Sequence, residues 1–278
     1  TPKDALYVPA AASRWLKEQI VQQGYAFKDF RVIYPGALVQ QFKMNILPDM
    51  DKLRIAYASI VLPYKGPHIL IKALKELHDK GIDFSCSLAG TSTDEKFVNS
   101  LKNFVTQTGM DEKVTFVGLL SREDLKNFFA RHNVLVFPSL VPEAFGISQV
   151  EAMAAGLTVV TSGTGGAKEI VEHRLSGVIF NSGDHKSLAQ ELLQLTADKE
   201  KWQQIAHAGQ KRALQCFDIE KSVDDIEKIY CHLIQHSEND TEYGKKIHGS
   251  ASYCNSANLS GPGLKKRCHR LIINKSRK

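Results

Sequence analysis

The chain has 278 residues, of which 43% are hydrophobic, and a formal net charge of +6. This length and composition are typical of a globular protein with a buried core and exclude a chain that is disordered throughout. The sequence contains no run of about 18 apolar residues and does not begin like a signal peptide, so we expect a cytoplasmic protein without a spanning helix.

The positive charge is concentrated near the C-terminus. Residues 245–278 contain nine Lys or Arg and no acidic residue, which leaves residues 1–244 at 27 minus 30, or −3. We expect residues 237–278 to be a disordered basic tail without a role of its own. The alternative is an electrostatic contact with anionic lipid, at the inner face of the membrane. Without aromatic residues between the cations, the tail does not indicate nucleic-acid binding.

The cysteines and histidines do not form a metal-site pattern. The five cysteines form no Cys-x-x-Cys pair and have no His-rich cluster beside them: Cys86, Cys216, Cys231, Cys254 and Cys268. We therefore expect neither a zinc site nor a disulfide framework. Two Asn-x-Ser triplets, at 258–260 and 274–276, are discounted as glycosylation sites because no signal peptide is seen.

The first part of the chain predicts one helix and one short strand. Apolar residues at helical spacing predict a helix over 10–23 that ends at Gly24. The apolar segment 30–34 predicts a strand that Pro35 and Gly36 stop.

From residue 53 onward strands and helices alternate. Strands are predicted at 53–59, 84–89, 114–118, 134–137, 157–161 and 177–180. Helices are predicted from Pro67 to Gly81, at 94–108, after Ser121, at 147–155, up to Glu172, and at 186–195, 199–215 and 219–236. Repeated strand-turn-helix units with apolar strands predict an α/β fold, a Rossmann-like parallel sheet with helices on both faces.

The most informative stretch is Leu140–Gly156, in which Glu143 and Glu151 are eight residues apart. Glu143 precedes the helix predicted at 147–155, and Glu151 lies inside it. The amides of residues 146–148 would open that helix, and such amides attract phosphate. Because carboxylates repel phosphate but accept hydrogen bonds from hydroxyl groups, the combination favours a sugar attached to a nucleotide.

Other polar or glycine-containing turns follow the predicted strands at the same edge. They contain Lys65, Gly90, Gly118 and the pair Gly165-Gly166. Ligands of parallel α/β sheets bind outside the carboxyl ends of the strands. We therefore expect these turns and the two glutamates to form one site.

Several motifs occur in register along the chain. They are Val32-Ile33-Tyr34-Pro35-Gly36 with Phe42, Lys65-Gly66-Pro67, Leu88-Ala89-Gly90, Val114–Gly118, Phe137-Pro138-Ser139, Glu143 with Glu151, Glu151–Gly156, and Gly165-Gly166 with Glu169. In this ordered series the sequence resembles glycosyltransferase family 4, the retaining nucleotide-sugar transferases of the GT-B arrangement. The resemblance covers about residues 13–230 and corresponds to the C-terminal, donor-binding half.

The resemblance implies roles for individual residues. Lys65 would meet the donor pyrophosphate, Glu143 the donor sugar and Glu151 the ribose hydroxyls, with Lys65 and Glu143 as the catalytic pair. The implied donor-binding set is Lys65, Gly118, Leu119, Leu120, Glu143, Phe145, Gly146, Ile147, Ser148 and Glu151. Taken singly, Lys65 could be a solvated turn residue and Glu151 a helix-surface carboxylate; the whole series favours the functional roles.

Two features depart from the family. The family commonly has Gly-Arg where this chain has Ser59-Ile60, so a basic residue beside Lys65 is absent. A complete two-domain enzyme of this family also has an N-terminal acceptor domain. We therefore expect either that this sequence is truncated or that a partner chain supplies the acceptor domain.

The domain assignment follows from these departures. We expect residues 1–27 to be a remnant of the acceptor domain and linker, 28–200 the donor-binding domain, and 201–236 helices that pack back toward the other half.

The predicted function is transfer of a hexose from a nucleotide diphosphate sugar, most simply a UDP-sugar, to a saccharide or lipid-linked acceptor. No cofactor or metal is expected. The first alternative is a nucleotide-sugar-binding module or subunit without turnover. A second is another enzyme on the same architecture, such as an epimerase or a phosphorylase.

Overall fold

The computed structural model describes residues 8–237 of the chain, and the side chains as far as residue 233. Val8–Ile229 form one compact unit, which is the subject of the following description. The second unit is described only at Tyr230–Ser237, the last residues of helix α9. The basic tail and the triplets at 258–260 and 274–276 lie outside the described residues.

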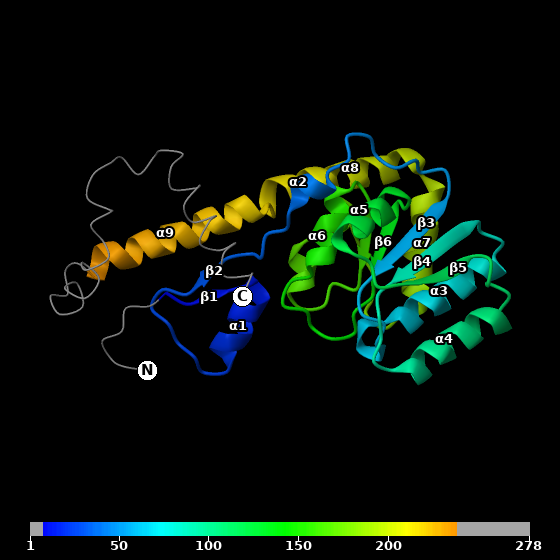
Figure 1. Cartoon of the computed structure of the whole chain (residues 1–278), viewed down its shortest axis with the longest axis horizontal. Coiled ribbons are helices and arrows are strands. Elements are labelled where there is room, and N and C mark those ends of the chain that lie inside the picture. The colour runs from blue at the N-terminus through cyan, green and yellow to red at the C-terminus, as the bar shows by residue number, and fades with distance from the viewer. Residues whose placement is uncertain (1–7, 238–278) are drawn as a thin grey trace. The chain divides into compact units, whose positions relative to one another are not determined.

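The compact unit is built around a six-stranded parallel sheet (Figure 1). Its strands are β3 (Leu53–Ala58), β4 (Phe84–Ala89), β5 (Val114–Gly118), β6 (Val134–Phe137), β7 (Thr158–Thr161) and β8 (Val178–Ile179). The spatial order is β5-β4-β3-β6-β7-β8, so the chain builds outward from β3 in one direction and then returns to build from β6 in the other. The point between β3 and β6 is therefore a topological switch point, where open α/β sheets bind their ligands.

The α-helices of the described chain are α1 (Arg14–Gln22), α2 (Val39–Phe42), α3 (Pro67–Asp79), α4 (Glu95–Gln107), α5 (Arg122–Ala130), α6 (Ile147–Ala154), α7 (His185–Ala197), α8 (Lys199–Cys216) and α9 (Ile219–Ser237). Two short 3₁₀ helices are η1 (Pro63–Lys65) and η2 (Gly166–Glu169). Local capping sets several of the starts, because the side chains of Asp94, Ser121 and Asp184 accept hydrogen bonds from amides in the first turns of α4, α5 and α7.

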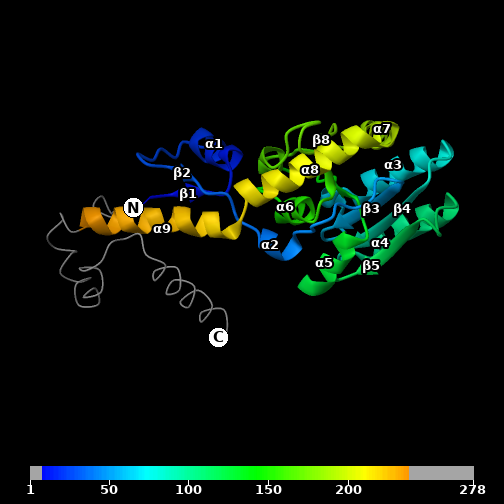
Figure 2. The ribbon, with the colours of Figure 1, turned by 90° about the horizontal axis from the view of Figure 1, so that it is seen from above.

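The central strands β3, β6 and β7 bury both of their faces almost completely, whereas the edge strand β5 exposes Thr115 and Val117 on one face. In β3, Ile55 and Tyr57 belong to the core cluster that includes α3, α4 and α7, whereas Ala56 belongs to the cluster that includes α5 and α6. Helix α6 packs against α8 on the second face (Figure 2). The expected Rossmann-like parallel sheet with helices on both faces is therefore confirmed.

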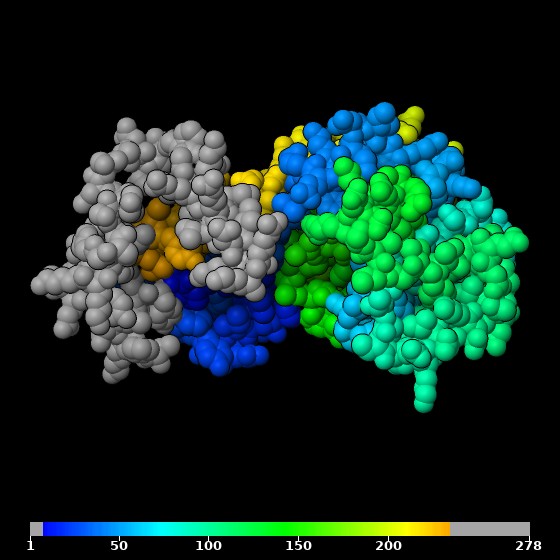
Figure 3. Space-filling view, in the orientation of Figure 1, coloured from blue at the N-terminus to red at the C-terminus, as the bar shows by residue number. Residues whose placement is uncertain are grey.

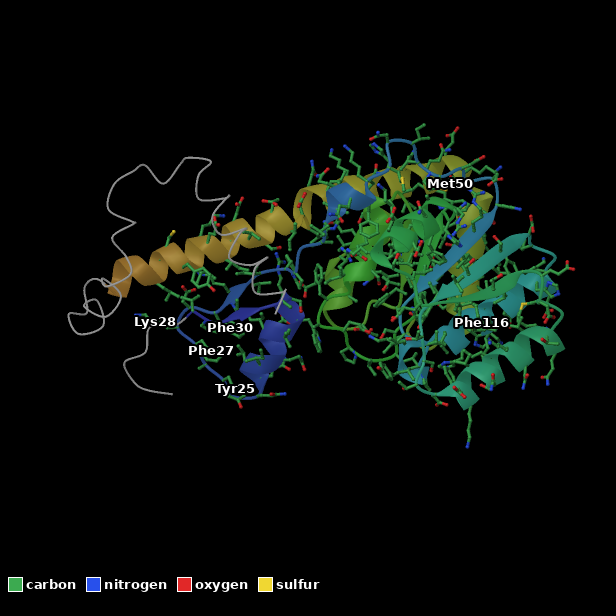
Figure 4. The ribbon with its side chains drawn as sticks, viewed as in Figure 1. Tyr25, Phe27, Lys28, Phe30, Met50 and Phe116 are labelled. Atoms are coloured by element: carbon green, nitrogen blue, oxygen red, sulfur yellow. The ribbon has the colours of Figure 1, made fainter. Side chains whose placement is uncertain are left out.

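Buried aromatic and sulfur-containing side chains fill the ends of this core. Met50 is buried in the first cluster before β3, and Phe116 packs against the same cluster from the edge strand β5 (Figure 4). Trp202 of α8 is fully buried, and its indole N–H donates to Thr158 Oγ1 at 3.0 Å. This bond satisfies the one polar group that the large ring would otherwise leave unpaired.

The N-terminal helix differs from the sequence prediction. It begins at Arg14 instead of residue 10, because Ala10–Ala11 form strand β1, which pairs in parallel with β2 (Arg31–Val32). Ser13 caps the helix by accepting from the amide of Leu16 at 3.1 Å. In the loop after α1, the rings of Phe27 and Phe30 meet edge to face at 5.1 Å (Figure 4).

The carboxylate of Glu169 holds the start of α1 as well. It accepts hydrogen bonds from the amides of Arg14 and Trp15, at 3.1 and 2.8 Å, and from the hydroxyl of Tyr34 at 2.8 Å. Burial and the bond to Glu169 raise the pKa of Tyr34. The short helix expected up to Glu172 is only the 3₁₀ turn η2, which Glu169 ends.

Two further observations concern predictions made from the sequence. Within residues 8–237, none of the helices is long and apolar enough to cross a membrane. Cys86, Cys216 and Cys231 are free thiols, whereas Cys254 and Cys268 lie outside the described residues.

Candidate functional site

The loop after β3 carries Lys65 to the switch point. Gly66, which follows Lys65, has a left-handed φ of 71°, and a Cβ at this position would lie 2.0 Å from the carbonyl oxygen of Pro138. The loop after β3 can therefore approach the loop after β6 this closely only with glycine. The amide of Leu140 donates to the carbonyl of Tyr64 at 2.8 Å and fixes the two loops together.

This approach brings Lys65 and Glu143 into contact. The Lys65 Nζ lies 2.6 Å from Oε1 of Glu143, and the two side chains are 18% and 16% exposed. The hydroxyl of Ser139 donates to the same Oε1 at 2.6 Å. The two residues expected to be catalytic are thus adjacent and neutralise each other in the free protein.

The backbone of Glu143 is held by the loop after β7. The amide of Gly166 donates to the Glu143 carbonyl at 2.7 Å, and the Glu143 amide donates to the carbonyl of Thr164 at 3.3 Å. Gly165, from the Gly165-Gly166 pair singled out in the sequence, therefore forms an isolated parallel β-bridge with Glu143 and holds its backbone in place.

Helix α6 begins beside Glu143 with uncapped amides. Its N-cap is Gly146, with φ of 116° and no side-chain capping bond. The first amides of an α-helix have no intrahelical acceptor, so those of Ile147 and Ser148 can bind an anion. Ile147 is exposed and Ser148 is half-buried, which leaves this helix start accessible.

Glu151 lies on the same helix, one turn further, with a buried side chain. Burial raises its pKa, and the guanidinium of Arg122 lowers it. The Arg122 Nη1 lies 2.8 Å from Glu151 Oε1. No sequence pattern indicates this pair, because Arg122 is an ordinary first residue of a helix that Ser121 caps.

The remaining predicted residues take different positions. Gly118 ends β5, and Leu119 and Leu120 follow it in the loop that leads to Arg122, so they approach the Glu151 end of the site. Leu119 is 77% exposed. The ring of Phe145 is buried against Tyr34 and Phe217, with centroids 5.6 and 5.5 Å apart, so it packs the loop and leaves only its backbone for a ligand.

The groups of the site meet at one edge of the sheet. In Figure 3, green and light-blue residues of the compact unit lie next to each other at the surface. Tyr64, Val141 and Ile147 are 41%, 38% and 43% exposed. A cation, two carboxylates and a free helix start therefore line one accessible edge. Ser139 and Arg122 are the two residues at this edge whose roles the sequence did not predict.

Comparison with known proteins agrees with this arrangement. Residues 40–212, more than half of the chain, match the family of glycosyl transferases group 1. The chain belongs to this family. The predicted resemblance to glycosyltransferase family 4 is thereby confirmed.

The relatives of this chain include two bacterial glycosyltransferases. The chain is 29% identical over 189 residues to the capsular polysaccharide biosynthesis glycosyltransferase CapM of Staphylococcus aureus, covering 68% of this chain and 48% of that protein. It is 27% identical over 190 residues to the amylovoran biosynthesis glycosyltransferase AmsK of Erwinia amylovora, covering 66% and 46%. The chain thus spans about half the length of these curated relatives.

Solved structures show the same fold. HepE of Anabaena in complex with UDP superposes with a TM-score of 0.73 at 28% identity, covering 80% of this chain and 63% of that one. The C-terminal domain of a group 1 glycosyl transferase from Francisella tularensis superposes with a TM-score of 0.57 at 24% identity, covering 67% and 96%. The group 1 chain therefore has the fold of the C-terminal half of a GT-B glycosyltransferase.

Proposed function

We propose that this chain binds the nucleotide-sugar donor of a retaining glycosyltransferase that moves a hexose from a UDP-sugar to a saccharide or lipid-linked acceptor. The observation that supports this most directly is the contact between Lys65 and Glu143 beside the uncapped start of α6. HepE, solved in complexes with UDP and with UDP-glucose, has this fold, which supports the choice of nucleotide.

Binding of the donor exchanges the partners of the Lys65–Glu143 pair. The diphosphate takes the ammonium group of Lys65 and the amides of Ile147 and Ser148, because all three donate hydrogen bonds to anionic oxygens. Glu143 then accepts hydrogen bonds from hydroxyl groups of the donor sugar. Glu151 does the same for the ribose.

In the transfer step, the bond between the sugar carbon and the diphosphate oxygen breaks, a bond from that carbon to the oxygen of the acceptor hydroxyl forms, and the hydroxyl proton passes to the departing diphosphate. Negative charge develops on the leaving diphosphate. Lys65 and the α6 amides stabilise that charge, and because these groups are in place beforehand the stabilisation requires little rearrangement.

Isothermal titration with UDP-glucose, GDP-mannose and ADP-glucose tests the proposal. The wild-type chain should bind at least one donor at micromolar to millimolar concentration, and Lys65→Met should weaken binding about tenfold or more by removing a charge-assisted contact. Lys96→Met, an exposed position on α4, is the matched control and should bind like the wild type. Absence of binding by the wild type, or equal binding by both variants, would contradict the proposal.

A nucleotide-sugar-binding module without turnover is the second candidate, since the described site residues all serve the donor. The two candidates differ in one measurement. Release of UDP from UDP-glucose in the presence of saccharide acceptors supports the transferase, whereas binding without release supports the module.

A further inference from the structure

Arg122 is fixed at the Glu151 end of the site by two contacts from different elements. Its Nη1 lies 2.8 Å from Glu151 Oε1, on α6. Its guanidinium carbon lies 5.3 Å from the centroid of the Phe42 ring, on α2. A stacked, planar guanidinium that also meets a carboxylate has little rotational freedom, so the charge stays in place.

The buried position of Glu151 means that its carboxylate needs a nearby cation to stay ionised. Its side chain is 4% exposed, and burial disfavours the ionised form. A protonated carboxyl group donates a hydrogen bond and loses acceptor capacity, whereas the ionised group accepts from two hydroxyl groups at once. The ribose contact proposed for Glu151 therefore depends on keeping this group ionised.

The helices and strands packed against α6 bury no other charged side chain beside Glu151 in the described part of the chain. Helix α6 packs against α2, β6, β7 and α8. The sequences of α2, β6 and β7 contain no titratable residue, and on α6 Glu151 is the one titratable residue. The residues that α8 buries are Trp202, Ile205, Ala206, Gly209, Gln210 and Ala213, all uncharged. Within the described chain, Arg122 is thus the cation that acts on Glu151.

We propose that Arg122 is a positioning residue of the nucleotide site, which keeps the buried Glu151 ionised and orients its carboxylate for the ribose hydroxyls. This inference rests on the proposed nucleotide-sugar function. It adds to that function a residue that acts through Glu151, contributed by the first turn of α5.

The pH dependence of UDP binding tests this role. Without Arg122, the pKa of Glu151 rises further, so affinity should be lost at a higher pH than in the wild type. For Arg122→Met we expect weaker binding than the wild type at pH 6, by at most about tenfold for each unit by which the pKa rises, and a smaller difference at pH 8.5. Arg122→Lys should restore most of the affinity at pH 6. Arg131→Met, an exposed arginine at the end of the same helix, is the matched control.

A second measurement tests the pair without any ligand. Carbon-detected NMR titration of the glutamate carboxyl groups, with Glu151 assigned by Glu151→Gln, should show a higher pKa for Glu151 in Arg122→Met than in the wild type. An unchanged pKa, or a loss of UDP affinity that is equal at pH 6 and pH 8.5, would overturn the role of Arg122 and leave the proposed function standing. Failure of the wild type to bind any nucleotide sugar would overturn both.

Discussion

Lys65 and Glu143 satisfy each other in the free protein, with 2.6 Å between Nζ and Oε1. At the scale of single residues, the donor site is therefore a set of charges that are already paired and that a donor must separate. Arg122 and Glu151 are paired as well, and in the proposed site this second pair stays together when the ribose binds. Substitution of Lys65 or Glu143 should alter binding, because each leaves its partner's charge unpaired in the free protein.

Ile60 is the residue at which an added charge should help. It is 42% exposed and follows Ser59, which lines the same recess as Lys65. Ile60→Arg would place a second cation near the donor diphosphate, worth about 1 kcal/mol at this exposure. We expect UDP to bind about fivefold more tightly at low salt, with the gain shrinking at high salt.

The control for this change is Ile46→Arg, because Ile46 is 86% exposed in the loop after α2. Titration of both variants at two salt concentrations is the measurement. Equal affinities for Ile60→Arg, Ile46→Arg and the wild type at low salt would show that position 60 does not face the phosphates.

Ser139 should affect binding of the sugar more than of the nucleotide. Its buried hydroxyl donates to Glu143 Oε1 at 2.6 Å. Ser139→Ala removes that donor, which lets the Glu143 carboxylate rotate and costs about 1 kcal/mol of its contact with the sugar. UDP-glucose should bind several-fold more weakly while UDP alone binds as before, and a parallel loss for both ligands would contradict the proposed role of Glu143.

At the scale of elements, close approaches between loops and uncapped helix starts bring the site together. Helix α6 starts at Gly146, where a Cβ would lie 2.5 Å from Nε2 of Gln149. The loops after β3 and β6 meet at Gly66 and Pro138. A side chain at Gly66 or Gly146 would therefore prevent the close contacts that hold these loops and the start of α6 together.

Gly66→Ala should destabilise the protein strongly. The new Cβ meets the Pro138 carbonyl at 2.0 Å in addition to the cost of a left-handed alanine, for about 2–5 kcal/mol in all. Gly81→Ala is a matched control, because Gly81 has nearly the same φ, 69°, and nothing within 4 Å of a Cβ. Urea unfolding should show only about 1 kcal/mol of loss for the control. Equal losses would mean that the loop after β3 moves away at no cost.

Gln149 and Gln210 form a second matched pair. Gln149 is fully buried in α6, and its amide nitrogen and oxygen have no hydrogen-bond partner in the described part of the protein. Gln210 donates instead to the carbonyls of Met44 and Ala154, at 2.8 and 3.0 Å. Gln149→Met should leave stability unchanged or raise it by about 1 kcal/mol, whereas Gln210→Met should lower it by about 1–3 kcal/mol. Thermal denaturation of both variants is the measurement, and the reverse order would reveal a ligand or water bound to Gln149.

At the scale of the whole molecule, the donor site costs stability. Glu151 is buried with a raised pKa, so protonation of its side chain is more favourable in the folded state than in the unfolded chain. For such a group the cost is absent below the pKa of the unfolded chain and fully present above the folded pKa. The folded unit therefore carries an energetic penalty at neutral pH, which the proposed contact between Glu151 and the ribose explains.

Glu151→Gln should remove this penalty. We expect the melting temperature of the variant to exceed that of the wild type at pH 7.5, and the difference to shrink as the pH falls toward the unfolded value near 4.5. UDP binding should be lost in the same variant. A difference in melting temperature that grows as the pH falls would contradict this sign, and Glu95→Gln, an exposed residue of α4, is the control.

The order of the elements was already determined by the sequence. Alternating apolar strands and capped helices predicted all six strands of the main sheet, because burial on both faces requires continuous apolar strands and caps mark helix starts locally. For this reason the sequence predicted the segments that form β3 to β8. It also placed Glu143 before helix α6 and Glu151 inside it. These signals are local and can be read within a few residues.

Contacts between distant residues were decided only by the tertiary structure. Residues 10–11 became a strand because β2 pairs with them, and Glu169 caps α1 from 154 residues away. Arg122 and Glu151 meet because α5 and α6 both begin at the carboxyl edge of the sheet. Sequence spacing carries no record of such a meeting, since the sheet topology sets which loops lie together. The charge state of the site therefore follows from the fold, while its residue types follow from the sequence.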